Sequence, residues 1–177
     1  SNERLSAGFE VDVLQKPYIV MKRALDQLDR DMIYSVGNYG YGEAWKWAGS
    51  IGGNLWRTTG DLMDTWSNLE SVGFRQAGRE VHVSPGRWND TDMLVVGNVG
   101  WGPDLHPTHL TKNEQILHIT LWAMQAAPLL IGADMSQLDA FTTALLTNDD
   151  VLDVDQDVLG KAGSRVWKQE KLEVWAR

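Results

Sequence analysis

Asn54-Leu-Trp-Arg-Thr-Thr-Gly-Asp61 is the stretch in which a strand passes into a helix. The apolar residues that follow it have helical spacing: Leu62, Trp66, Leu69 and Val72. This pattern predicts a strand over 51–58 and a helix over 61–72. Arg57 and Asp61 are therefore expected at the carboxyl end of a strand, where α/β proteins build their functional sites.

Arg57 and Asp61 have side chains suited to binding and proton transfer. A guanidinium presents five N–H donors in a fixed fork, which fits vicinal hydroxyls or carboxylates. The carboxyl group of Asp61 can give or take a proton. A structural interpretation stays open, in which Asp61 caps the helix and Arg57 pairs with it.

The composition favours a globular domain and is compatible with an uncharged ligand such as a carbohydrate. The chain has 177 residues, 43% of them apolar, which is enough for one core. Its formal charge of −8 argues against binding to nucleic acid or to an anionic membrane surface. Nine tryptophans suit either a large core or a site that stacks sugar rings. The absence of cysteine excludes disulfides, thiolate catalysis and cysteine–metal sites.

The sequence carries no recognisable targeting signal. The chain does not begin with Met, and neither a basic-then-apolar segment nor a run of membrane-spanning length is present. We interpret it as a processed or truncated chain whose targeting signal was elsewhere. The localisation is left open, with a secreted or periplasmic protein as one option.

Strand-like and helix-like segments alternate through most of the chain. The expected strands are 31–36, 51–58, 87–94 and 128–132. The expected helices begin at Pro17, Glu43, Asp61, a capping box formed by Thr111 and Glu114, and Ser136 with Asp139. Connections of this kind imply an α/β fold, with a parallel sheet and helices outside it.

The end of the chain has a different pattern. Segments 164–167 and 171–177 alternate with period two, which predicts an antiparallel hairpin. Residues 153–157 resemble the start of a calcium loop. However, Val158 and Ser164 stand where an EF-hand needs Gly and Glu, so we reject calcium binding here.

Two further polar groups lie outside the 54–61 stretch. The segment 87–94 contains the carboxylates Asp90 and Asp92 around a β-prone core. His106 and His109 lie in a Gly/Pro-rich region, and we interpret them as solvated loop histidines rather than metal ligands.

Several of these segments match known motifs. The motifs, in order, are Tyr34-Ser-Val-Gly-Asn-Tyr-Gly40, Trp56-Arg-Thr-Thr-Gly-Asp61, Trp88-Asn-Asp-Thr-Asp-Met-Leu94, Leu121-Trp-Ala with Ala127-Pro-Leu-Leu130, and Asp155-Gln-Asp-Val-Leu-Gly-Lys161. Together they resemble glycoside hydrolase family 27, the α-galactosidase and α-N-acetylgalactosaminidase family. The match runs from about residue 17 to residue 163. One such motif is weak, but the ordered series is specific.

The resemblance implies a fold larger than this chain. Family members have a (β/α)8 TIM barrel followed by an antiparallel β domain. Residues 1–150 would form a partial barrel, its C-terminal half. Residues 151–177 would form a linker and the first strands of the β domain.

The resemblance also implies retaining hydrolysis of terminal α-linked galactose by two aspartates, without a metal or cofactor. Asp61 matches the family's general acid/base, and Arg57 matches the arginine that holds the sugar hydroxyls. The other expected substrate-binding residues are Gly37, Asn38, Tyr39, Asp92 and Met93. We expect Tyr39, Arg57, Asp61 and Asp92 to converge at the carboxyl ends of adjacent strands.

This chain departs from the family pattern around the sugar pocket. Gly37 and Tyr39 stand where the family usually has Cys and Trp, and Asn38 stands where Glu is common. Thr91 replaces the usual Pro. An α-galactoside, an α-N-acetylgalactosaminide and a β-L-arabinopyranoside therefore all stay open as substrates.

The catalytic nucleophile is expected outside this chain. The family carries it in a Lys-x-Asp segment, and nothing in residues 1–15 matches that segment. We therefore expect a glycosidase fragment that is inactive alone, also because Arg57 and the helix start favour the charged form of Asp61. Open strand edges predict self-association or pairing with the missing half-barrel. The alternatives are a non-catalytic carbohydrate-binding or scaffold half-barrel, and a plain α/β domain with a structural Arg57–Asp61 pair.

Overall fold

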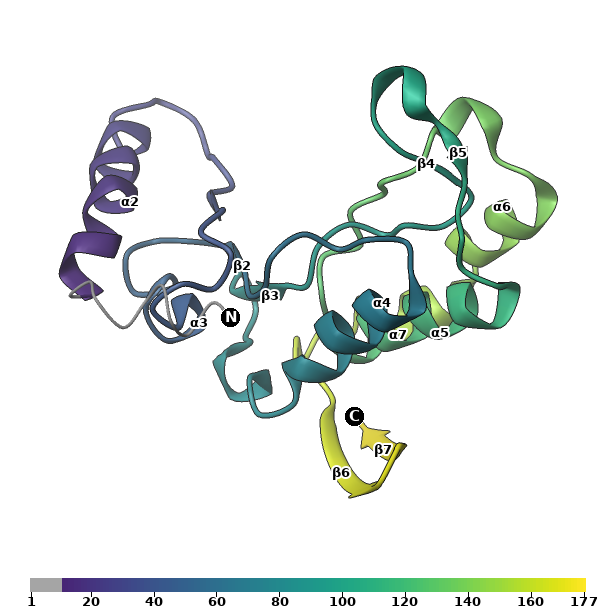
Figure 1. Ribbon diagram of the computed structural model, residues 1–177. Helices are drawn as coiled ribbons and strands as arrows, with labels where there is room; N and C mark the ends of the chain where they lie inside the picture. Colours follow the sequence, from purple (N-terminus) through teal and green to yellow (C-terminus); the bar gives the residue numbers. More distant parts are fainter. Residues whose placement is uncertain (1–10) are drawn as a thin grey trace.

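The computed structural model describes residues 11–177 and shows mixed α-helices and β-strands (Figure 1). The helices are α2 (Val11–Leu25), α3 (Ala44–Trp47), α4 (Trp66–Gly73), α5 (Lys112–Met124), α6 (Ala140–Leu146) and α7 (Asp149–Asp155). The strands are β1 (Ser35–Val36), β2 (Leu55–Arg57), β3 (Trp88–Asp90), β4 (Asn98–Val99), β5 (His106–Pro107), β6 (Ser164–Gln169) and β7 (Leu172–Ala176). In this described range, no helix has the length and apolar character needed to cross a membrane.

A parallel sheet forms the centre of the molecule. Its strands lie in the order β1-β2-β3, and a further parallel bridge joins Leu94 to Ile131. The predicted parallel sheet is confirmed for these three strands, but the expected strand over 128–132 is reduced to that bridge. Pro128 has no N–H to donate, and the Leu130 N–H turns back to the Pro128 carbonyl at 2.9 Å instead of continuing a ladder.

Two clusters of buried apolar side chains lie on the two sides of this sheet. Figure 1 shows α2 and α3 on one side of β2 and β3, and α4, α5 and α7 on the other. The first cluster comprises Tyr34, Val36, Ala44, Trp47, Ala48 and Trp56. The second is built around Leu69, Val72, Leu94, Val96, Leu121 and Trp122. Burying one such large side chain stabilises the fold by about 1.5–3 kcal/mol, so the clusters hold the strands between the helices.

Helix α2 begins earlier than the sequence predicted. It contains Pro17 in its interior, so the expected start at Pro17 is wrong. A proline removes one hydrogen bond of a helix. Here the helix continues on both sides, and Tyr18 and Leu25 pack against the first cluster.

Helix α4 begins later than predicted, at Trp66 instead of Asp61. The N–H groups that would continue the helix toward Asp61 have other partners. The Leu62 N–H donates to the carboxylate of Asp92 at 2.7 Å, and the Met63 N–H donates to Asn68 Oδ1 at 2.7 Å. Asp61 is therefore a loop residue, and the expected influence of a helix start on it is wrong.

Helix α5 has the predicted capping box. The Thr111 N–H donates to the Glu114 carboxylate at 2.7 Å, and the Glu114 N–H donates to Thr111 Oγ1 at 3.4 Å. Asp139 caps α6 as predicted, since its carboxylate accepts the Thr142 N–H at 2.7 Å. Ser136 does not begin that helix, because it lies in a separate 3-10 turn.

Two elements were not predicted. Helix α7 crosses residue 150, packs against α5 and ends at Asp155, so much of the segment compared with a calcium loop is helical. Strands β4 and β5 form a two-stranded antiparallel ribbon inside the Gly/Pro-rich region. This ribbon is where His106 lies, and its position matters for the polar cluster described below.

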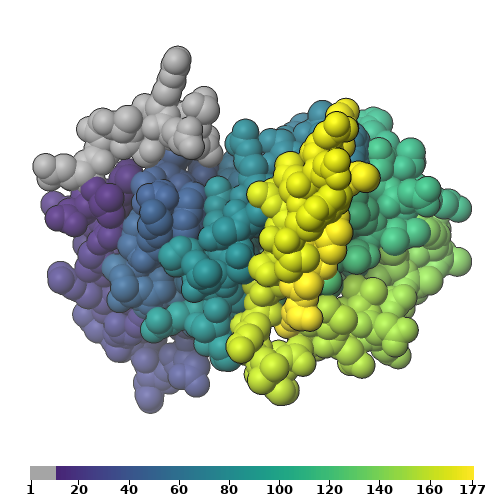
Figure 2. All heavy atoms as spheres, turned by 90° about the horizontal axis from the view of Figure 1, so that it is seen from below, coloured from purple at the N-terminus to yellow at the C-terminus, as the bar shows by residue number. Residues whose placement is uncertain are grey.

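The predicted C-terminal hairpin is confirmed as β6 and β7. Figure 2 shows this hairpin lying along one face of the molecule, against the segments that precede it. Its contacts fall at the end of α5: the Gly163 N–H donates to the Met124 carbonyl at 2.7 Å, and Arg177 Nη1 donates to the Ala123 carbonyl at 3.0 Å.

Candidate active site

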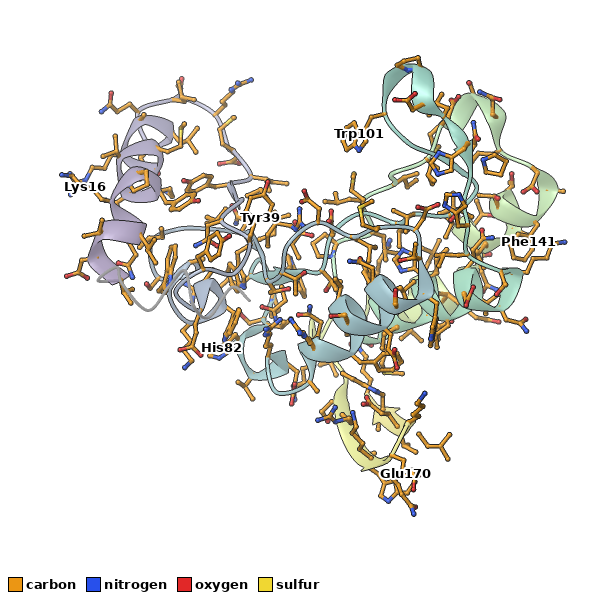
Figure 3. All side chains as sticks on the ribbon, viewed as in Figure 1. Lys16, Tyr39, His82, Trp101, Phe141 and Glu170 are labelled. Atoms are coloured by element: carbon orange, nitrogen blue, oxygen red, sulfur yellow. The ribbon has the colours of Figure 1, made fainter. Side chains whose placement is uncertain are left out.

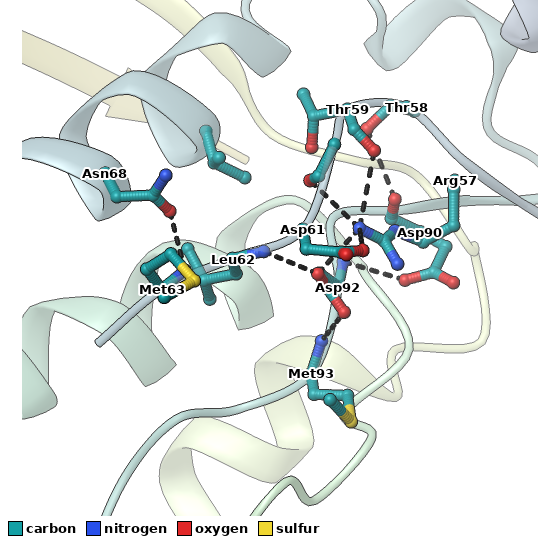
Figure 4. Close-up of polar contacts among 12 residues, drawn as sticks. Arg57, Thr58, Thr59, Asp61, Leu62, Met63, Asn68, Asp90, Asp92 and Met93 are labelled. Carbon is teal, nitrogen blue, oxygen red and sulfur yellow. Dashed lines mark hydrogen bonds and ion pairs between the residues drawn. The ribbon is translucent and has the colours of Figure 1, made fainter. Parts of the chain in front are cut away.

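Arg57, the last residue of β2, is the centre of the candidate site (Figure 4). Its Nη2 contacts Asp92 Oδ2 at 2.6 Å, the Gly60 carbonyl at 2.9 Å, and Asp61 Oδ1 and the Thr59 carbonyl at 3.3 Å. The two carboxylates differ in accessibility: the Asp92 side chain is 6% exposed and that of Asp61 is 69% exposed. The predicted convergence of Arg57, Asp61 and Asp92 is therefore confirmed.

Asp92 holds the base of the site rigid. Besides binding the arginine, its carboxylate accepts the Leu62 N–H at 2.7 Å and the N–H of half-buried Met93 at 2.8 Å. Its own N–H donates to Asp90 Oδ1, and its carbonyl accepts the Trp122 indole N–H, both at 2.8 Å. These bonds fix a backbone φ of 88°, which non-glycine residues rarely adopt. The Asp92 carboxylate consequently has a structural role, because both of its oxygens already accept hydrogen bonds from the protein.

Asp90 lies beneath Asp92, and its side chain is buried. Burial raises the pKa of Asp90, while the N–H of Asp92 and the charge of Arg57 oppose that rise. The group is out of reach of a ligand at the surface, so it supports the chain segment that carries Asp92.

The 37–42 loop contributes Tyr39 to the site. The guanidinium carbon of Arg57 lies 5.4 Å from the centroid of the Tyr39 ring, which is a cation–π distance. Asn38 shapes the loop from inside: its Nδ2 donates to the Tyr41 carbonyl at 3.0 Å, and its Oδ1 accepts the Gly40 N–H at 3.2 Å. Tyr39 therefore joins the site as predicted, whereas the buried amide of Asn38 is engaged within the loop.

Gly37 leaves space at the start of this loop. A Cβ atom placed on Gly37 would have no atom within 4 Å. The position where the resembled family usually has a larger residue is thus open to solvent.

A cavity of about 800 Å³ lies beside Asp61. Its lining includes Tyr39, Trp45, Asp61, Arg75 and Arg79, but neither Arg57 nor Asp92. Arg79 lies over the Trp45 ring, 3.9 Å from its centroid, and burial lowers the pKa of Arg79 to about 10. Figure 3 shows Tyr39 near the middle of the molecule, at the edge of this region. Asp61 can therefore be approached from solvent while its arginine stays covered.

The His106 and His109 side chains are 38% and 67% exposed, as expected for solvated histidines, but both also contact one carboxylate. His106 Nε2 lies 3.3 Å and His109 Nδ1 lies 2.8 Å from Oδ2 of Asp64, a residue of the loop that carries Asp61. Burial of Asp64 opposes the effect, but the hydrogen bonds and charges of both histidines lower the pKa of its carboxyl group. Asp64 has no sequence motif that links it to residues so distant along the chain, which is why sequence reasoning missed it.

Comparisons with known proteins agree on one family. The family model for alpha galactosidase A (Melibiase_2) matches residues 6–157. Alpha-galactosidase 2 of Arabidopsis thaliana is 41% identical over 159 residues, which are 90% of this chain and 38% of that protein. A solved structure from Bacteroides fragilis, provisionally named an alpha-galactosidase/melibiase, has a TM-score of 0.87 and 35% identity, covering 92% of this chain and 36% of that one.

A second solved structure has a related activity. It is a GH27 β-L-arabinopyranosidase from Geobacillus stearothermophilus, with a TM-score of 0.80 and 30% identity, covering 89% of this chain and 37% of that chain. The chain thus spans well under half the length of these relatives. Its mixed α/β elements cover part of their fold of a TIM barrel and a β domain. On the family match and these identities, the chain belongs to the alpha-galactosidase family of glycoside hydrolases, GH27.

Proposed function

We propose that this chain provides the acid/base side of a retaining galactoside hydrolase, with Asp61 as the general acid and then the general base. One observation carries the proposal. Of the two carboxylates that contact Arg57 Nη2, Asp61 is exposed and has one weak contact, while Asp92 is buried and fully engaged. Only the carboxyl group of Asp61 is free to reach a glycosidic oxygen.

The roles of the neighbouring residues follow from their positions. Arg57 contacts the Asp61 carboxylate, and although its side chain is only 14% exposed, a guanidinium has further N–H groups that can donate to a sugar hydroxyl. Tyr39 offers an aromatic face next to it, suited to the apolar face of a sugar ring. Asp92 fixes the arginine from the buried side, and the Met93 N–H helps to hold the Asp92 carboxylate in place.

The second carboxylate of the reaction comes from elsewhere in this proposal. A retaining pair needs two carboxyl groups about 5 Å apart, one of which attacks the anomeric carbon. The nearby candidates Asp90 and Asp92 are buried. Both oxygens of Asp92 accept hydrogen bonds, and Asp90 Oδ1 accepts the Asp92 N–H. We therefore assign residues 1–150 to the C-terminal half of a (β/α)8 barrel and 151–177 to a linker and the start of the β domain. The other half of the barrel would supply the nucleophile.

Terminal α-linked galactose is the proposed substrate, because the relatives are named alpha-galactosidases. One observation favours a second candidate, the β-L-arabinopyranoside, which lacks the hydroxymethyl group of galactose. A β-L-arabinopyranosidase is among the similar structures. The open space at Gly37 is compatible with either sugar.

The test compares leaving groups. The chain is combined with the N-terminal barrel half of a GH27 relative, and hydrolysis is measured on aryl and alkyl α-galactosides and on aryl β-L-arabinopyranosides. A good leaving group such as dinitrophenol needs no proton, whereas an alkyl alcohol does. Asp61→Asn should therefore lower kcat/KM, which reports the step that releases the alcohol, about 10²–10⁴-fold for alkyl galactosides and far less for the dinitrophenyl glycoside.

Asp153→Asn is the matched control, because Asp153 is an exposed aspartate on α7. Its rates should equal those of the unmodified chain with every substrate. Equal losses in kcat/KM with good and poor leaving groups in Asp61→Asn would rule out the acid/base role. Turnover by the chain alone would show that it contains its own nucleophile.

A further inference from the structure

A second cluster of polar side chains lies outside the proposed active site. It consists of Asp64, His106 and His109, whose ligand atoms all lie within 4.8 Å of one another. We propose that these three residues bind a divalent transition metal of the zinc class, which joins the 58–65 loop to the β4–β5 ribbon. This site goes beyond the proposed hydrolysis, which uses no metal.

The hydrogen bond of His106 sets up its other nitrogen as a ligand. Nδ1 lies 3.0 Å from the Asp104 carbonyl oxygen, which can only accept, so Nδ1 carries the proton. In the neutral ring the lone pair is then on Nε2, and this atom faces Asp64 Oδ2 at 3.3 Å. A lone pair that faces a carboxylate oxygen is stabilised by a positive charge between them, which a metal ion or a second ring proton can supply. A ring N–H bonded to a backbone carbonyl is also the usual support of a metal-binding histidine.

The donor set and the spacing fit zinc. In a tetrahedral zinc site with bonds of about 2.0–2.1 Å, the ligand atoms lie about 3.3 Å apart. Asp64 Oδ2 is 3.3 Å from His106 Nε2 and 2.8 Å from His109 Nδ1, so one of the three spacings matches and a second is about half an ångström short. Two imidazoles with one carboxylate form a donor set typical of zinc, with a fourth position left for water.

The third spacing requires a small movement, and the structure permits it. The His109 side chain is 67% exposed, so its ring can turn toward His106 without displacing the core. Asp64 is only 12% exposed and is fixed by the His109 N–H, which donates to Oδ2 at 2.8 Å. One ligand is thus held in place, and the exposed side gives a hydrated ion a path to it.

A close backbone approach within the β4–β5 ribbon orients the His106 ring. Gly100 has a φ of 117°, and a Cβ there would lie 2.4 Å from the Asp104 carbonyl oxygen. Only glycine allows this close approach, which brings the Asp104 carbonyl to the His106 ring. The turn of the ribbon therefore supplies the bond that orients the proposed ligand.

The test is zinc titration of the full chain by calorimetry, with cobalt(II) absorption as a probe of tetrahedral coordination. We expect one zinc per chain, visible-region bands with cobalt, and a melting temperature that rises with zinc concentration. His109→Gln and His106→Gln should each weaken zinc binding at least about tenfold. His82→Gln is the matched control, because His82 lies far from the β4–β5 ribbon in Figure 3. Circular dichroism checks that each variant is folded.

Three results would overturn the proposal. The first is the absence of saturable zinc binding by the unmodified chain. The second is equal zinc affinity in His82→Gln, His106→Gln and His109→Gln, which would show non-specific uptake. The third is a His106 ring that stays doubly protonated by nitrogen NMR in excess zinc, which would show that a proton, and not a metal, lies between His106 and Asp64.

Discussion

Replacement of Asp92 by asparagine would test whether the buried Arg57–Asp92 pair holds the site together. Three donors converge on this carboxylate: Arg57 Nη2 at 2.6 Å and the Leu62 N–H at 2.7 Å on Oδ2, and the Met93 N–H at 2.8 Å on Oδ1. An amide of the same size has one acceptor oxygen and one NH₂ group. In either orientation, the amide introduced by Asp92→Asn would place N–H donors against N–H donors.

The expected loss of stability can be worked from these contacts. Removing one partner of a buried ion pair costs about 3–5 kcal/mol. Arg57 keeps the Gly60 carbonyl at 2.9 Å, which places the loss near the lower end, at about 3 kcal/mol. Asp92→Ala should cost a similar amount. Asp92→Gly should be about 1 kcal/mol less harmful than Asp92→Ala, since glycine relieves the strained φ of 88°.

Urea unfolding followed by tryptophan fluorescence measures these losses. The indole N–H of Trp122 donates to the Asp92 carbonyl, so the emission of Trp122 reports directly on this region. Asp153→Asn on α7 is the control for removing an exposed carboxylate and should change stability by less than about 0.5 kcal/mol. The reasoning is refuted if Asp92→Asn stays within that same margin, or if it is far more stable than Asp92→Ala.

Two further predictions concern acid stability and assembly. His118 is buried and accepts the Val95 N–H at 3.0 Å, and burial lowers its pKa to about 3. The unfolded chain binds a proton at His118 below about pH 6.5 and the folded chain does not, so stability falls by up to about 1.4 kcal/mol per pH unit from pH 6.5 toward pH 3. His118→Gln, which keeps an acceptor, should show a shallower fall in urea midpoint, and an equal slope would contradict this. Ile33 next to β1 and Ile131 at the other end of the sheet are exposed, and exposed apolar residues at sheet edges favour self-association. We therefore expect light scattering to give a mass above that of the monomer, rising with concentration. A monodisperse monomer at high concentration would contradict this expectation.

The sequence predicted features that depend on local chemistry. The Thr111–Glu114 capping box, the Asp139 cap and the period-two hairpin all act between residues a few positions apart, and each was found where expected. The convergence of Arg57, Asp61 and Asp92 was predicted because the carboxyl ends of parallel strands meet at one edge.

The errors arose where distant residues compete for backbone groups. The apolar spacing after Asp61 suited a helix, but the Asp92 carboxylate takes the Leu62 N–H from a position 30 residues away. The spacing of apolar residues along the sequence cannot indicate such a long-range hydrogen bond. The Asp64 contacts with His106 and His109 were missed for the same reason.

Helix α7 is a different case, because a local signal was present. Asn148 accepts the Val151 N–H at 3.2 Å as an N-cap, and Asp149 and Asp150 lie in the first turn, where acidic residues are favoured. The signal for α7 is therefore local, in contrast to the long-range contacts of Asp92 and Asp64.

The site has two parts that differ in how they tolerate substitution: a fixed foundation, formed by Arg57 and Asp92 with the groups they bind, and a rim, formed by residues 37–39. Arg57 and Asp92 form one connected unit with the Gly60 carbonyl that Arg57 binds and the Leu62 N–H that Asp92 binds, so a change in either side chain disturbs the loop that carries Asp61. Gly37 has empty space around it and Tyr39 is partly exposed, so new side chains at the rim meet little resistance. Selection for a different sugar can therefore act on the rim while the foundation stays intact, and relatives with different substrates can share one acid/base framework.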